Sequence, residues 1–171
     1  DDNAFFWWIG TDPNYYEPMA DGYRTRKTEY CAADVIVDHM NTREDPRRSS
    51  YFQPTKESVE AGELKYVGYT IGAKANAVAS KYSIWGARFF TDLDGFSPYM
   101  RVAEPWFCVA EASMLGWNTG ISAEDAYNKA VTYSMEENSV SAEDIADYLA
   151  NAGKFTNDKK QIYYEEWVAM F

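Results

Sequence analysis

The sequence has little of what metal-dependent and nucleophilic enzymes usually require. Its 171 residues include one histidine, His39, and two cysteines, Cys31 and Cys108, with no CxxC motif. One histidine argues against most histidine-based zinc sites and against a Ser-His-Asp hydrolase. Two cysteines provide neither a disulfide framework nor a redox motif. We expect His39, near the end of a predicted helix, to interact with the last backbone carbonyls.

Basic residues and long apolar runs are also scarce. Sixteen Lys and Arg stand against 27 Asp and Glu, a net charge of −11. This balance argues against nucleic acid and against docking on anionic lipid. The sequence contains no run of about 20 apolar residues, so no membrane span is predicted. The chain has no initiator Met, signal peptide or lipidation signal, and it closes on an apolar helix end, so we expect a fragment of a longer protein.

What the chain does have is aromatic residues, including 14 Tyr and 6 Trp. Amphipathic rings suit surfaces that bind something with both apolar and polar faces. A hydrophobic content of 46% indicates a globular chain. The length predicts one domain over 1–171, with a loop-rich part at 1–98 and a helical part at 99–171.

The loop-rich part is punctuated by glycine, proline, Asn and Asp. Residues 1–24 read as an aromatic, turn-rich loop. A helix is predicted near 28–43, ended by Asp45-Pro46. Residues 46–98 predict a long irregular segment with short strands at 64–67 and 82–85. Irregular segments of this length in a compact chain are usually functional.

The helical part predicts antiparallel helix pairs. A helix over 101–115 ends at Gly116, and Ser-Ala-Glu-Asp occurs twice, at 122–125 and 141–144, as a capping-box-like start. Helices follow at 123–137 and 142–152. We expect Asn157 to cap a final helix with one apolar side, made by Ile162, Tyr163, Trp167 and Met170. The fold class is therefore mainly α, with helical pairs like those of tetratricopeptide repeats.

Two glutamates, Glu104 and Glu111, lie seven residues apart in a helix predicted to be entered through Pro98, and would share one face. They fit the paired carboxylates of a glycoside hydrolase. However, the helix body is apolar, and Arg101 lies one turn from Glu104. We therefore expect Arg101, Glu104 and Glu111 to be structural.

Ligand binding is predicted for aromatic residues in the loop-rich part. The candidates are Trp7, Trp8, Tyr15, Tyr16 and Trp85, with Arg88 beside them. A flat ring stacks on the C–H face of a sugar, while nearby Asn, Asp and Arg bond its hydroxyl groups. The alternative is that these rings hold the loops onto the helical scaffold.

A calcium site is a further candidate at Asp92-Leu93-Asp94-Gly95. This stretch begins like a calcium loop, but the later ligands and the closing glutamate of an EF-hand are missing. A solvated turn is the competing interpretation. No other metal or cofactor is predicted.

An ordered set of short motifs resembles one family. The motifs are Asp45-Pro46-Arg47, Tyr66-Val67-Gly68 with Gly72, Tyr82-Ser83, residues 98–104 (PYMRVAE), Ala110-Glu111-Ala112 and the terminal stretch 162–171 (IYYEEWVAMF). Together they resemble the SusD/RagB family of surface nutrient-binding lipoproteins, over most of 45–171. Pro105 departs from the family pattern and predicts a kink, or a helix that starts at Pro105.

The resemblance implies a mainly α-helical, non-catalytic protein of the outer membrane. Such proteins are lipid-anchored at the cell surface and pass glycans, or in some cases peptides, to a SusC-like TonB-dependent transporter. The function hypothesis is therefore oligosaccharide capture without chemistry. The alternatives are a peptide-binding member of the same family, a glycoside hydrolase using Glu104 and Glu111, and a helical-repeat module that binds a protein.

Overall fold

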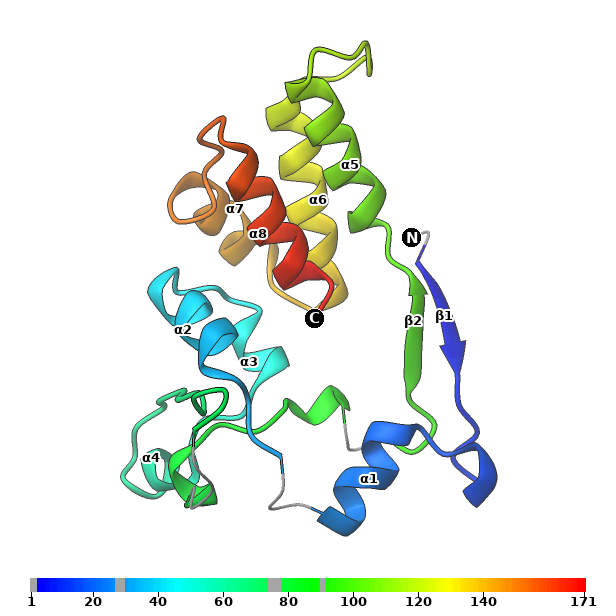
Figure 1. Cartoon of the computed structure of the whole chain (residues 1–171), viewed down its shortest axis with the longest axis vertical. Helices are drawn as coiled ribbons and strands as arrows, with labels where there is room; N and C mark the ends of the chain where they lie inside the picture. The colour runs from blue at the N-terminus through cyan, green and yellow to red at the C-terminus, as the bar shows by residue number, and fades with distance from the viewer. Residues whose placement is uncertain (1–2, 27–29, 74–77, 90–91) are drawn as a thin grey trace. The chain divides into compact units, whose positions relative to one another are not determined.

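The computed structural model describes residues 3–26, 30–73, 78–89 and 92–171. The chain divides into two compact units, shown in Figure 1. The helical unit comprises residues 98–171 with 1–5, and the loop-rich unit comprises residues 6–97. Strand β1 (Ala4–Trp7) pairs with strand β2 (Phe96–Met100) in a two-stranded sheet.

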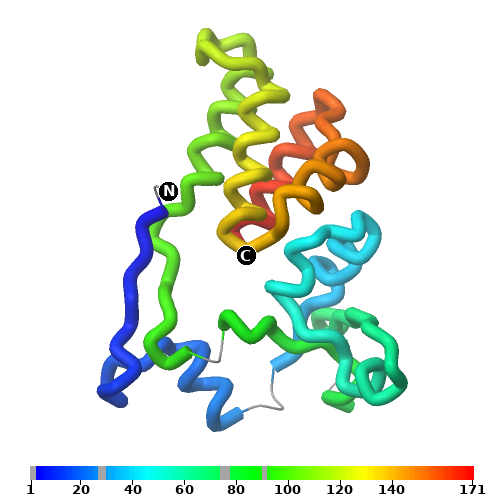
Figure 2. Tube along the Cα trace, turned by 180° about the vertical axis from the view of Figure 1, so that it is seen from behind, coloured from blue at the N-terminus to red at the C-terminus, as the bar shows by residue number. Residues whose placement is uncertain are grey.

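The helical unit contains four helices. They are α5 (Ala103–Met114), α6 (Ala123–Glu137), α7 (Ala142–Ala150) and α8 (Lys159–Ala169). α5 and α6 form an antiparallel hairpin and α8 packs on both, as Figures 1 and 2 show from opposite sides. In the described part of the chain, no helix is both long and apolar enough to cross a membrane.

Small side chains set the close packing of α5 on α6. Ala103 and Ala110 on α5, and Ala126 and Ala130 on α6, are almost fully buried in one core cluster. Phe107 packs edge-on against Tyr127, with ring centroids 6.4 Å apart. Buried apolar area of this kind is the main stabilising term for a helical hairpin.

The helix ends follow the predicted caps with one exception. The Ser122 and Ser141 hydroxyls accept the N–H groups of Asp125 and Asp144, at 3.0 and 3.1 Å. Gly116, after α5, has a φ of 81°, which favours glycine. The cap of α8 is Asp158, whose carboxylate accepts the Lys160 N–H, so the expectation for Asn157 is wrong by one residue.

Two predictions about the start of α5 need correction. Residues 96–100 form β2, because they pair with β1, so α5 begins at Ala103 and not through Pro98. Pro105 is the third residue of α5, where an N–H has no partner within the helix, so no kink is required.

The buried side of α8 differs from the predicted one. Ile162, Glu165, Val168 and Ala169 are buried, whereas Tyr163 and Trp167 are exposed. The Tyr148 hydroxyl donates to the Glu165 carboxylate at 2.6 Å. This hydrogen bond offsets part of the desolvation cost of burying the acid. A pattern of apolar residues alone placed the acid on the wrong side.

The loop-rich unit is more regular at its start than its sequence predicted. Residues 1–24 contain β1, a 3-10 helix (Pro13–Tyr15) and most of α1 (Pro18–Arg26). The Glu17 carboxylate accepts the Ala20 N–H at 2.6 Å and so caps α1. Because β1 depends on pairing with a strand about 90 residues away, a local reading of the sequence could not find it.

The helix predicted near 28–43 is shorter. α2 covers Asp34–Thr42, with His39 in its last turn, and residues 27–29 lie outside the described part. Residues 30–33 are not helical: Ala32 donates to Ser83 O at 2.8 Å and accepts from Tyr69 N at 2.7 Å. These long-range bonds replace the helical ones.

The strand predicted at 82–85 is reduced to one isolated bridge, and residues 64–67 form neither a strand nor a bridge. Trp85 pairs with Phe52 and Tyr69 pairs with Ala33. The described part of 46–98 also contains two short helices, α3 (Arg48–Tyr51) and α4 (Lys56–Glu60), and two 3-10 helices (Ala79–Lys81 and Ala87–Phe89). A Cβ on Gly86 would lie 1.9 Å from the Ser50 carbonyl oxygen, so only glycine allows this close approach.

A charged pair lies in the core of the loop-rich unit. The Asp45 and Arg47 side chains are fully buried and joined at 2.5 Å, with Arg47 Nε donating to the same carboxylate at 2.9 Å. The buried apolar residues of the same unit include Ile36, Val37, Met40, Tyr51 and Phe52. The predicted Asp-Pro-Arg turn is therefore a structural ion pair.

Candidate functional site

Trp7, Phe96 and Arg88 lie together in the loop-rich unit, and we call them the Trp7 cluster. The Trp7 and Phe96 ring centroids are 5.3 Å apart at an angle of 56°. The Arg88 guanidinium lies 5.5 Å from the Phe96 centroid and 5.0 Å from that of Phe89. Trp7 is 62% exposed, so its ring is supported on one side and open to solvent on another.

Trp8 follows Trp7 but is held differently. Its indole Nε1 donates to the Ser97 hydroxyl at 2.9 Å, and its ring meets Phe6 edge-on at 4.8 Å. Its backbone N–H donates to Gly95 O. These bonds fix the end of β1 and with it the position of Trp7.

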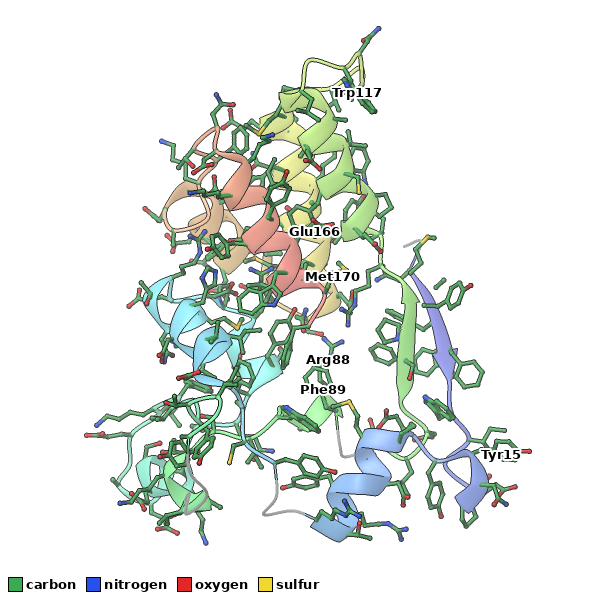
Figure 3. The ribbon with its side chains drawn as sticks, in the orientation of Figure 1. Tyr15, Arg88, Phe89, Trp117, Glu166 and Met170 are labelled. Carbon is green, nitrogen blue, oxygen red and sulfur yellow. The ribbon has the colours of Figure 1, made fainter. Side chains whose placement is uncertain are left out.

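Tyr15 and Tyr16 follow the turn after β1. Tyr15 is exposed on the 3-10 helix, as Figure 3 shows, and its carbonyl accepts the Ile9 N–H at 2.9 Å. The Arg24 guanidinium lies 5.5 Å from the Tyr16 ring and also pairs with Asp21 at 2.8 Å. Tyr16 therefore contacts α1.

Trp85 stacks on Tyr30, with centroids 4.9 Å apart at 32°. It is half-buried and takes part in the bridge to Phe52. This position matches the alternative in which a ring holds loops together. Arg88, three residues later on the 3-10 helix Ala87–Phe89, belongs to the Trp7 cluster. Figure 3 shows it beside Phe89.

Of the six predicted residues, Trp7 and Arg88 are brought together because both contact Phe96. Trp8 anchors the paired strands β1 and β2 through its bonds to Ser97 and Gly95. Phe96 was missed, because its role depends on β2 pairing with β1. Its only signal in the sequence is aromatic character near Pro98, which is too common to identify a site. A ligand role for any of these residues stays a prediction.

Glu104 and Glu111 belong to an acidic group on the helical unit. Glu104 is exposed, and Glu111 accepts a hydrogen bond from the Tyr163 hydroxyl. Burial raises the pKa of Glu166 on α8 above its ordinary value of 4.5, and the charges of Glu104 and Glu111 raise it further. Burial and the same three carboxylates raise the pKa of the Cys108 thiol.

Arg101 pairs with Glu137, although its spacing from Glu104 predicts a pair with that residue. It lies 3.2 Å from the Glu137 carboxylate and donates to Ala169 O at 3.0 Å, which ties the start of α5 to the ends of α6 and α8. The reason is that residues 96–100 form a strand, so Arg101 precedes α5 instead of lying one helical turn before Glu104.

Two grooves lie apart from these residues. One, of about 580 Å³, is an open groove along α6 between Ile121 and Glu136. The other, of about 380 Å³, lies within the loop-rich unit and has Pro54, Val59, Tyr82 and Ile84 in its wall. Neither groove is lined by Glu104, Glu111 or any of the six predicted ligand residues.

The candidate calcium site is a turn in which the Asp92 carbonyl accepts the Gly95 N–H at 3.0 Å. Over residues 3–26, 30–73, 78–89 and 92–171, no group of three or more His, Cys, Asp or Glu residues is placed to hold a metal ion. Cys31 and Cys108 both lie in these ranges, and both are thiols.

Several solved structures of SusD-like proteins are similar to the chain. A SusD homologue from Bacteroides fragilis has a TM-score of 0.82 and 20% identity, covering 98% of this chain and 41% of that one. A SusD-like protein from Bacteroides thetaiotaomicron has 0.65 and 28%, covering 81% and 34%. A chitin-binding SusD homologue from Flavobacterium johnsoniae has 0.69 and 23%, covering 94% and 38%.

This chain therefore spans well under half the length of these structures. No curated protein matches it. A family model described as starch-binding and associating with the outer membrane matches residues 1–171. The mainly helical, partly SusD-like fold expected from the sequence is confirmed, and the family description is one of binding, not of catalysis. The chain belongs to the SusD-like family.

Proposed function

We propose that this chain is part of a non-catalytic protein that captures oligosaccharide at the outer membrane, with the Trp7 cluster as a stacking surface. The observation that carries the proposal is the 62% exposed Trp7 ring, supported by Phe96 with Arg88 beside it. A supported flat ring gives a sugar an apolar contact at little entropic cost, and a guanidinium donates to its hydroxyl groups. Family membership and the chitin-binding relative add support.

Calorimetric titration of the intact protein with maltohexaose and chitohexaose tests the proposal. We expect saturable binding of at least one of them, and an affinity about tenfold lower for Trp7→Ala, since stacking supplies about 0.5–1.5 kcal/mol or more. Val35→Ala, which truncates another exposed apolar side chain of the same unit, is the matched control. If neither sugar binds, or if Trp7→Ala binds with the same affinity as the unaltered protein, the proposal is wrong.

A basic peptide is a second candidate ligand, favoured by the net charge of −11. A lysine-rich hexapeptide titrated under the same conditions distinguishes the two. Binding of the peptide that weakens steeply with salt, without binding of either hexasaccharide, would favour the peptide.

The hydrolase alternative has a direct test as well. We expect no cleavage when the protein is incubated with either hexasaccharide and the products are separated by chromatography. Cleavage that is lost in Glu111→Gln would show that the protein is an enzyme.

We also propose a cell-surface location through a lipid anchor, and a SusC-like TonB-dependent transporter as partner. Family membership supports both, since its description includes association with the outer membrane. Affinity purification of the tagged protein from detergent-solubilised outer membranes should recover one TonB-dependent transporter in near-equal amount. Recovery without any such transporter would contradict the partnership.

A further inference from the structure

Trp117 lies on the loop between α5 and α6 and is more exposed than Trp7. It is 70% exposed, and its neighbour Leu115 is 52% exposed. Figure 3 shows Trp117 on this loop at the end of the hairpin. Of the other aromatic residues of the hairpin, Phe107 and Tyr127 are buried in the core, and Trp106 and Tyr133 pack against it. An exposed large ring beside a well-packed core calls for a physical explanation.

The loop is held in one conformation by its own hydrogen bonds. The Trp117 N–H donates to Ala112 O and the Gly116 N–H to Ser113 O, both at 3.0 Å, which forms a Schellman-type helix end. The Ser113 and Thr119 hydroxyls are 2.6 Å apart, and Thr119 donates to Ile121 O at 2.9 Å. Trp117 is therefore exposed on a loop whose backbone is hydrogen-bonded.

The surroundings of the ring leave room for a ligand. Gly116 and Gly120 have φ values of 81° and 74°, and a Cβ at either would meet nothing within 4 Å. Asn118, next to Trp117, is exposed and carries both a donor and an acceptor. A flat apolar face with an amide beside it fits a pyranose ring, whose C–H face stacks while its hydroxyl groups accept and donate.

The charges at the adjoining ends of α5 and α6 favour a neutral ligand over an anionic one. The first turn of α6 is acidic, with Glu124 and Asp125, and the last turn of α5 has no basic residue. Lys129 is already placed over the Trp106 ring at 4.4 Å. A sulfated or uronic sugar or an anionic lipid would be repelled here, whereas a neutral sugar would not.

We propose that Trp117 and the loop 115–121 form a second stacking site for neutral oligosaccharide, in the helical unit. This inference rests on the proposed function, because it takes its ligand class from there. A loop whose backbone is ordered before binding loses little entropy when a sugar docks. A single ring and one amide give weak binding, so we expect a low affinity at this site.

The test is fluorine NMR of the intact protein labelled with 5-fluorotryptophan. The chain has six tryptophans, and each resonance is assigned by a Trp→Phe substitution. During titration with maltohexaose and chitohexaose, we expect saturable shifts of the Trp117 and Trp7 resonances. The Trp117 shift should persist in Trp7→Ala. The resonance of Trp106, packed against Lys129, is the internal control and should not move.

The possible outcomes separate this inference from the proposed function. A shift of Trp7 without Trp117 overturns this inference and leaves the proposed function standing. A shift of Trp117 alone supports the inference and removes the Trp7 cluster. If neither resonance moves with either sugar, both are wrong. Trp117→Ala should keep the unfolding temperature of the unaltered protein, because the ring is exposed, and lower affinity at this site about two- to tenfold.

Discussion

The helical unit and the loop-rich unit reach a stable core by different physical means. In the helical unit, alanines and rings from α5, α6, α7 and α8 form one apolar cluster, and the backbone bonds are satisfied inside the helices. The loop-rich unit instead buries the Asp45–Arg47 pair and joins distant segments by single backbone bonds. The first kind of core tolerates changes in its loops, whereas the second depends on a few irreplaceable contacts.

The largest effect is expected in the loop-rich unit for Asp45→Ala. This change leaves the Arg47 charge buried without its carboxylate, which costs about 3–5 kcal/mol. Urea unfolding should show the loss, and Asp38→Ala on the exposed side of α2 is the matched control. A loss below about 1 kcal/mol would show that the pair is not decisive, and the comparison between the units would fail.

Met135→Ala tests the apolar core of the helical unit. Met135 is fully buried, so the substitution should cost about 2–5 kcal/mol through lost burial and a cavity. Met135→Leu, which nearly keeps the volume, should cost less than about 1.5 kcal/mol in the same urea titration. Equal losses for the two variants would mean that volume does not control this core.

Ser141→Ala tests a helix cap in the same unit. The hydroxyl accepts the Asp144 N–H, so its loss should lower the free energy of unfolding by about 1 kcal/mol. Thermal unfolding measures the change, and Ser141→Thr should restore most of it. If Ser141→Ala is as stable as the unaltered protein, α7 depends on packing alone.

The smallest effect is a pH dependence from Glu166. Its pKa is raised in the folded state, so its ionisation destabilises the fold as pH rises through that value, and the effect is absent below its ordinary pKa of 4.5. Glu166→Gln should therefore unfold at a higher temperature than the unaltered protein at pH 8, and at the same temperature at pH 4. The gain is about a few tenths of a kcal/mol, because the group is partly solvated.

Glu136→Gln, on the exposed side of α6, is the control for removing one carboxylate. A Glu166→Gln variant that is less stable at pH 8 would contradict the repulsion from Glu104 and Glu111.

Local chemistry predicted the helical unit well. Both Ser-Ala-Glu-Asp sequences cap helices, and Gly116 ends α5 as expected, because each feature involves residues within one turn of each other. The errors fall where distant residues decide. Tyr148 determines that Glu165 is buried, and β1 determines that residues 96–100 are a strand. The Trp7 cluster joins residues about 90 positions apart, so only its members, and not their meeting, could be read locally.

The sequence by itself determined the helical composition, the serine caps of α6 and α7, the acidic balance that argues against nucleic acid, and the family. These depend on residue type and on spacing within a few turns. Only the tertiary structure decided which aromatic rings are exposed, which partner Arg101 takes, and which side of α8 faces the core. Those outcomes depend on contacts between segments far apart in the chain, where one hydrogen bond or one buried charge outweighs local preference.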